Sequence, residues 1–448
     1  MANPNEKQKV RAEASKKAAT LEIHISTKAA VILASMLLLP HFALVVLALT
    51  HKSIGPDAAM TRLISLLEPK SNSTSANNSA LLNVADRASS CSPGPWGNLE
   101  YVRMSIEIPE EYVSAHLHET APSSWLFKNY TPEKLAEFFG KVDLSATERK
   151  ELLDHNQWRI SPTGVILQPT SQTLLSLGAN ARSTIYSALA EFPENNAQDQ
   201  PFAFPPGTFE KHFEKSGLGD ETVALVKRLC YPHGELLLFA DLPTVLHTLK
   251  TYEEKVHLEK ALSRRETLLV KLHVTPDSNI DELLKYWGRA GSARDLRPML
   301  ESLSRVPGGA RVSLAHLIPP WPTARLYTFP FPSENAAEDC HWTSFNFFKD
   351  PPEPIPPDGQ LLRHKLDTEY YPVTSDPRYG DLVMLATSAG PIIHSCIFLA
   401  DNIVYSKNGA NHTAPWLLAT IPEVLSTYSA FIPTNETLKV LYYRNKNY

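Results

Sequence analysis

A long apolar run near the amino terminus constrains this chain more than any other feature. Residues 29–50 form an almost unbroken apolar stretch, interrupted near its middle by Pro40 and His41. As a helix rising 1.5 Å per residue, the run would be about 33 Å long, which is enough to cross a bilayer core. We therefore expect a transmembrane anchor over residues 29–50, and we expect the rest of the chain to fold on one side of a membrane.

The charges that flank this run predict its orientation. The basic residues before the run are Lys7, Lys9, Arg11, Lys16, Lys17 and Lys28, and the one that comes closely after it is Lys52. The positive-inside rule then predicts a cytoplasmic basic segment over residues 1–28 and an extracytoplasmic remainder, periplasmic or at the cell surface. A cleaved signal peptide with a weak small-residue site at residues 46–48 is the alternative, and it also implies export.

Composition bounds what the exported part contains. Residues 51–97 are expected to be a linker, because the stretch 71–80 (SNSTSANNSA) has no apolar period with which to bury a core. The net charge of −5 gives no reason to expect nucleic-acid binding. The four cysteines are too few for a disulfide scaffold and include no Cys-x-x-Cys pair for zinc, although a single Cys91–Cys230 bridge remains open.

Residues 98–330 are expected to form a mixed α/β domain of unknown function. Alternating or continuous apolar patterns predict strands near residues 100–108, 234–242 and 268–274. Helical periodicity predicts helices near residues 131–140, 145–153, 173–189, 245–266 and 280–287. No motif in this part points to a particular chemistry.

The candidate nucleophile is Cys340. Asp339 can cap a helix that begins at Cys340, and the apolar residues after it suit a buried helix. A cysteine at a helix amino terminus lies at the positive end of the helix dipole, which favours the thiolate. The free backbone N–H groups of such a helix end can also hold an oxyanion.

Two further segments come after Cys340 in the chain. Residues 378–385 contain a Gly380-Asp381 turn that leads into an apolar strand. Residues 390–409 are typical of two strands joined by a turn at Asp401-Asn402, with His394 near the start of the first strand and a polar cluster at the end of the second.

The residues Asp339-Cys340, Gly380-Asp381-Leu382-Val383 and His394, in this order and spacing, resemble the NlpC family of cell-wall cysteine peptidases, part of the papain-like superfamily. The resemblance covers residues 331–448, about the last quarter of the chain. It implies a domain of α+β class in which the helix that carries Cys340 packs on an antiparallel sheet that carries His394. The whole chain is then expected to be α+β, with this domain after the mixed α/β domain and the transmembrane helix.

The sequence departs from the family pattern at two places. His341-Trp342 stands after the cysteine where the family usually has Ser-Gly, and the third catalytic residue is not obvious. A two-residue turn at Asp401-Asn402 would place Gly409 opposite His394, so Asn408 reaches the imidazole only if the hairpin contains a one-residue bulge. Asn408 is the preferred third residue, with Lys407 and Ser406 as alternatives.

The resemblance, together with export, implies a membrane-anchored amidase or endopeptidase acting on peptidoglycan peptides. Cys340 would be the nucleophile, His394 its base and Asn408 the residue that orients the imidazole. No metal and no organic cofactor is expected. Two alternatives remain open, namely a catalytically weak module that binds cell-wall peptides or a protein partner, and a cysteine acyltransferase.

Overall fold

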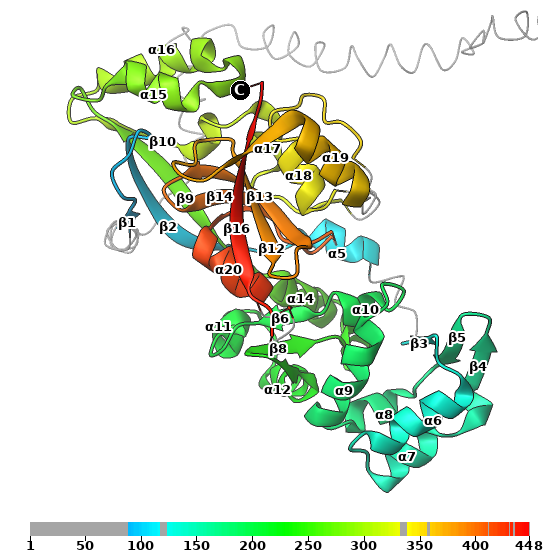
Figure 1. The fold of residues 1–448 in the computed structure, drawn as a ribbon. Coiled ribbons are helices and arrows are strands. Elements are labelled where there is room, and N and C mark those ends of the chain that lie inside the picture. Colours follow the sequence, from blue (N-terminus) through cyan, green and yellow to red (C-terminus); the bar gives the residue numbers. More distant parts are fainter. Residues whose placement is uncertain are drawn as a thin grey trace, which may run out of the picture. The chain divides into compact units, whose positions relative to one another are not determined.

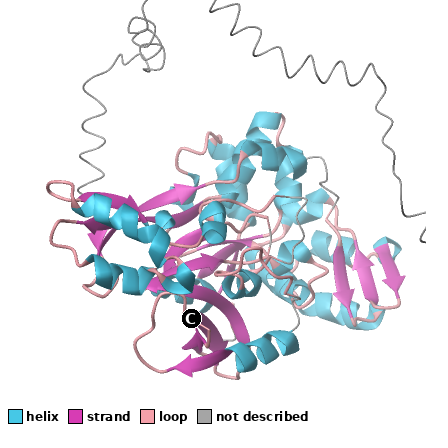
Figure 2. Cartoon of the chain, turned by 90° about the horizontal axis from the view of Figure 1, so that it is seen from above, coloured by secondary structure: helices cyan, strands magenta, loops and turns pink. Residues whose placement is uncertain are grey.

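The computed structural model describes residues 88–116, 123–331, 338–355, 359–410, 412–429, 431–432 and 435–447. These residues lie within one compact unit, Leu82–Tyr448. Every strand pairing among them is antiparallel, and the strands are interspersed with helices, so the fold class is α+β (Figure 2). The expected transmembrane segment, residues 29–50, lies outside the described residues, and no helix within them is long and apolar enough to cross a bilayer.

A four-stranded sheet brings together strands from residues 89–106 and from residues 265–313. Its order is β1 (Ser89–Ser90), β2 (Asn98–Ile106), β9 (Arg265–Val274) and β10 (Ala310–Ser313). β2 and β9 pair from Asn98 opposite His273 to Ile106 opposite Arg265, and Figure 1 shows them side by side. Residues 107–264 are therefore an insertion at the tip of a hairpin.

This insertion contains two small three-stranded sheets. One has the order β3 (Trp125–Lys128), β5 (Gly164–Leu167), β4 (Trp158–Ser161), and the other has the order β6 (Phe202–Phe204), β8 (Leu236–Phe239), β7 (Tyr231–His233). The helices are α5 (Glu110–His116), α6 (Pro132–Lys141), α7 (Ala146–Leu152), α8 (Ser171–Ser176), α9 (Ala179–Ala190), α10 (Asn196–Asp199), α11 (Phe209–Phe213), α12 (Asp220–Leu229), α13 (Leu242–Thr248) and α14 (Tyr252–Ser263). Two separate hydrophobic cores lie within the insertion.

Two of the expected helices are each divided in two. The helix expected at residues 173–189 breaks at Gly178, where the backbone is extended and α9 begins. The helix expected at 245–266 breaks before Thr251, which caps α14 in a reciprocal capping box with Glu254. In both cases a local start signal lies inside an apolar pattern that continues across it.

The C-terminal region is built on a six-stranded sheet. The order is β11 (Tyr370–Val373), β16 (Leu438–Asn445), β12 (Leu382–Thr387), β13 (Ile392–Ala400), β14 (Ile403–Lys407) and β15 (Trp416–Thr420). Its helices are α18 (Cys340–Phe345), α19 (Gly359–Glu369) and α20 (Ile421–Ser429), and before them the chain forms α15 (Ile280–Trp287), α16 (Ala293–Ser304) and α17 (Pro320–Arg325). α18 packs against β13 and β14 (Figure 1). α20 packs against β15.

One hydrophobic core joins the two larger sheets. It contains Val270 and Leu272 of β9, Trp287 of α15, and Leu399 and Trp416 of the six-stranded sheet. Hydrogen bonds cross the same interface, since the Tyr286 hydroxyl donates to the Leu399 carbonyl at 2.7 Å. The core therefore extends across residue 330, where the sequence suggested a boundary between two domains.

Candidate active site

Cys340 is the first residue of α18, as the capping pattern predicts. The Asp339 carboxylate accepts the Trp342 backbone N–H at 2.7 Å and so caps the helix. Trp342 and Phe345 anchor the helix in the core that joins the two larger sheets. The cysteine is itself buried, with 7% of its surface exposed.

His394 lies on β13 and has no exposed surface. Its ring stacks on Tyr428 of α20, with ring centroids 4.2 Å apart and planes inclined by 21°. The Nε2 atom lies 3.1 Å from the Ser406 hydroxyl oxygen. The Nδ1 atom is buried and has no hydrogen-bond partner in the described part of the chain.

A bulge in the β13–β14 hairpin brings the third polar group to His394. Ile397 pairs with Tyr405 and Phe398 with Val404, but the register shifts by one residue before Ala400 pairs with Ile403. Continued past the end of β14, this register places Asn408 opposite His394. The bulge that Asn408 requires is therefore present.

Ser406 connects His394 to Asn408. The Ser406 hydroxyl donates to Asn408 Oδ1 at 2.6 Å. Because a hydroxyl has one proton, Ser406 must accept the hydrogen bond that joins it to His394, and the imidazole proton is then on Nε2. Nδ1 carries the free lone pair. Ser406 thus makes the direct contact and Asn408 the outer one, whereas Lys407 points to the opposite face of the strand.

Two residues that the sequence interpretation did not assign lie beside Cys340. The Ser395 hydroxyl oxygen is 3.3 Å from the Cys340 carbonyl oxygen and 2.9 Å from His341 Nδ1. The backbone N–H groups of Ser395 and His341 lower the pKa of the Cys340 thiol. The only signal in the sequence for the contact of Ser395 with His341 was the departure at His341, where the family pattern has serine.

Cys340 and His394 lie on opposite faces of the sheet, because Cys340 contacts Ser395, whereas His394, the neighbouring residue of β13, stacks on Tyr428 of α20. Burial dominates the electrostatics of both groups. Desolvation, followed by the Asp339 charge, raises the pKa of Cys340 to about 12, against the opposing effects of backbone N–H groups and Lys407. Desolvation, followed by His341, lowers the pKa of His394 to about 3. At neutral pH the thiol is therefore protonated and the imidazole neutral in this conformation. The helix dipole does not outweigh the loss of hydration.

The Gly380-Asp381 turn has a structural role. Gly380 has a φ of +87°, and a Cβ atom there would lie 2.4 Å from the Phe348 ring. The fully buried Asp381 carboxylate is bound by Arg444, with Nη2 to Oδ2 at 2.7 Å, and by Arg289 Nη1 at 3.3 Å from Oδ1. These ion pairs fix the start of β12 to β16 and to the residues after α15.

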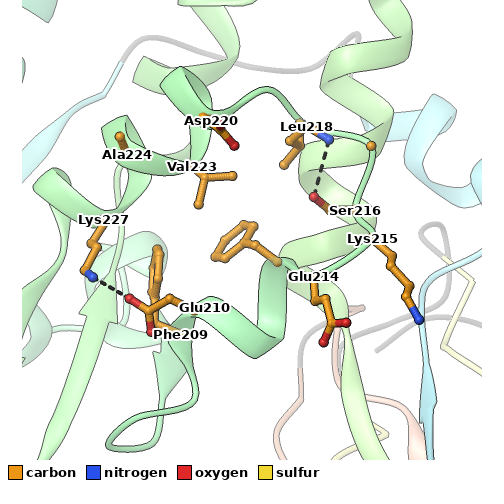
Figure 3. Close-up of a pocket in the computed structure, with 12 residues that line it drawn as sticks. Phe209, Glu210, Glu214, Lys215, Ser216, Leu218, Asp220, Val223, Ala224 and Lys227 are labelled. Carbon is orange, nitrogen blue, oxygen red and sulfur yellow. Dashed lines mark hydrogen bonds and ion pairs between the residues drawn. The ribbon is translucent and has the colours of Figure 1, made fainter.

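The described residues contain no cluster of three or more side chains suited to hold a metal ion. All four cysteines are free thiols, so the Cys91–Cys230 bridge left open by the sequence is not formed. Figure 3 shows an open hollow between α11 and α12, lined by apolar Phe209 and Val223 and by the Lys227–Glu210 ion pair. None of the expected catalytic residues lines it.

Comparisons with known proteins give no relative. No family model matches the chain, and neither a curated protein nor a solved structure matches it. The resemblance to the NlpC family thus depends on the residues around Cys340, Gly380 and His394 alone.

Proposed function

We propose that this chain is a cysteine hydrolase that cleaves an amide bond, with Cys340 as nucleophile and His394 as general base. The observation that carries the proposal is the hydrogen-bonded chain from His394 Nε2 through Ser406 to Asn408. It leaves Nδ1 as a buried base without a partner among the described residues. An unsatisfied buried nitrogen is unfavourable for stability, so a role in proton transfer gives a reason for it.

The chemistry would proceed from this arrangement. The sulfur of Cys340 attacks the amide carbonyl, and the thiol proton passes to His394 Nδ1 after a movement that brings the two groups together, because Cys340 packs on the Ser395 face of β13 and the His394 ring on the Tyr428 face. Ser406 and Asn408 stabilise the imidazolium, because Ser406 accepts from Nε2–H and Asn408 orients Ser406. Backbone N–H groups at the start of α18 hold the oxyanion, and the imidazolium then protonates the departing amine. Water hydrolyses the resulting thioester and restores the thiol, so the scheme needs neither metal nor organic cofactor.

The proposed substrate is a peptidoglycan stem peptide. The motif resemblance at Cys340, Gly380-Asp381 and His394 supports this substrate class. The expected membrane anchor at residues 29–50 and the basic residues before it support a location outside the cytoplasm, where such peptides lie. The enzyme would then act on the cell wall while attached to the membrane.

The test is cleavage of muropeptides by the full chain, followed by mass spectrometry. We expect new amine-ended fragments with the unmodified chain and almost none with Cys340→Ala or His394→Ala, since the two side chains act as a unit. Cys396→Ala is the matched control, because Cys396 is a buried thiol on the strand that carries His394. The same products from the unmodified chain and from Cys340→Ala would rule out the hydrolase.

A binding module for cell-wall peptides is the second candidate. The near-complete burial of Cys340 and His394, with both groups neutral at pH 7, favours it. Calorimetric titration of muropeptides separates the two proposals. Binding that is equal in the unmodified chain and in Cys340→Ala, with no product from either, would favour the module.

A further inference from the structure

Lys407 is buried beside the candidate nucleophile. It lies at the end of β14 and has no exposed surface. Its ammonium donates to the Gly409 carbonyl at 2.7 Å and lies 5.4 Å from the centre of the Trp416 ring. A carbonyl and a ring face solvate an ammonium but do not neutralise its charge. A buried cation of this kind needs anionic partners.

The partners of Lys407 lie at the amino end of α18. The β13–β14 register, continued by two residues, places Lys407 opposite Ser395, whose hydroxyl contacts the Cys340 carbonyl. The groups that raise the pKa of the ammonium are Cys340, when it is a thiolate, and the Glu338 and Asp339 carboxylates. Arg325 of α17 faces the same Trp416 ring, with its guanidinium 4.9 Å from the ring centre.

We propose that Lys407 is a positioning residue of the Cys340 site, whose buried ammonium stabilises the Cys340 thiolate during reaction. This inference deepens the proposed cysteine chemistry and rests on it. Burial and the Asp339 carboxylate both oppose ionisation of the thiol. A positive charge in the same low-dielectric surroundings acts on the thiolate more strongly than it would in water.

The charge of the Lys407 ammonium depends on pH in a range that an experiment can reach. Burial lowers the pKa of Lys407 to about 8, against the raising effect of the nearby anions. The positive charge is therefore complete well below pH 8 and is lost as the pH rises above that value. Any help that Lys407 gives to the thiolate must disappear over the same interval, whereas an effect on packing alone would persist.

The experiment measures how fast methyl methanethiosulfonate, a small thiol reagent, modifies Cys340 in the full chain at pH 7 and pH 10. In Lys407→Met we expect modification about tenfold slower at pH 7, equivalent to one unit of thiol pKa, and nearly the unmodified rate at pH 10. Lys439→Met is the matched control, because Lys439 is an exposed lysine of the same sheet. Cys230, in a separate core, is the internal reference.

Equal rates for the unmodified chain and Lys407→Met at pH 7 would overturn the inference, and so would a change of the same size at both pH values. If Lys407→Met does not fold, Lys407→Gln takes its place, since an amide can still donate to Gly409. If neither neutral variant folds, Lys407 is a structural residue and the inference is rejected. Labelling needs no substrate, so absence of muropeptide cleavage with the expected labelling pattern would reject the hydrolase and leave the Lys407–Cys340 coupling established.

Discussion

At the scale of single residues, the hydrogen-bonded chain from His394 through Ser406 to Asn408 supports the proposed chemistry. Ser406 contacts the imidazole through Nε2, and Asn408 holds the Ser406 hydroxyl in its accepting orientation. We expect Ser406→Ala to lower kcat/KM for muropeptide cleavage by roughly tenfold to a hundredfold, because the imidazolium loses its acceptor. Asn408→Ala should cost less.

Ser426→Ala is the control for this prediction, because Ser426 is exposed on α20 near Tyr428. Its kcat/KM should match that of the unmodified chain. A Ser406→Ala variant with unchanged kcat/KM would show that the hydrogen-bonded chain plays no part in turnover.

The buried imidazole also predicts how stability depends on pH. The pKa of His394 is lowered to about 3 in the folded chain, so the unfolded chain binds the proton more readily as the pH falls below 6.5. The stability that neutral His394 provides is present above pH 6.5 and is lost progressively toward pH 3. Between pH 6.5 and pH 5 the loss is about 2 kcal/mol.

Urea unfolding at pH 7 and pH 5 measures this loss. The difference in unfolding free energy between the two pH values should be about 2 kcal/mol smaller in His394→Gln than in the unmodified chain. His212, whose pKa burial lowers to about 4, provides a second case, and His212→Gln should change the difference in the same direction. Identical differences in all three chains would contradict the buried, neutral state of both histidines.

At the scale of elements, the Asp381 ion pairs fix β12 within the sheet. Removing the charge of a buried partner leaves Arg289 and Arg444 without their carboxylate, and both are largely buried. We expect Asp381→Asn to lower the free energy of unfolding by roughly 3 kcal/mol. The exposed Arg363–Asp367 pair of α19 is the comparison, and Asp367→Asn should cost less than about 1 kcal/mol. If urea unfolding shows the same loss of unfolding free energy for Asp381→Asn and Asp367→Asn, the Asp381 ion pairs do not fix β12 within the sheet.

The elements also show what the sequence can predict locally. Asp339 and Cys340 form a cap and helix start as expected, because the signal lies within a few consecutive residues. The sequence showed that Asn408 needs a bulge to reach His394, but it did not show where the bulge lies. Its position near Leu399 depends on the strand register, and the register depends on which face of β14 packs into the core. The contact of Ser395 with His341 joins residues 54 positions apart, and no local pattern encodes it.

At the scale of the whole molecule, the division into domains was the hardest feature to predict. Local patterns predicted strands at β2 and β9, but they did not predict that the two strands pair, because residues 107–264 separate them in the sequence. No pattern in the sequence indicates that the sheet they form shares its core with the strands after residue 330. Shared burial is a property of tertiary packing, so composition and spacing do not reveal it.

The shared core makes a prediction about the insertion. Ile106 and Arg265 are direct partners, so a two-residue Asn-Gly turn can replace residues 107–264. We expect the shortened chain to unfold cooperatively in urea, because the two larger sheets keep their common core. A fragment that begins at residue 331 lacks β2 and β9 and should not unfold cooperatively. Cooperative unfolding of the fragment, together with non-cooperative unfolding of the shortened chain, would contradict the single core.

The most direct test of the central claim is to look for the acyl-enzyme itself. The full chain is mixed with muropeptide, quenched in acid within seconds and digested for peptide mass spectrometry. We predict that the peptide containing Cys340 gains the mass of the acyl group of the substrate less one hydrogen, and that Cys340→Ala shows no such adduct and releases no product. Product release that persists in Cys340→Ala, with no adduct on the unmodified chain, would contradict the claim that Cys340 is the nucleophile.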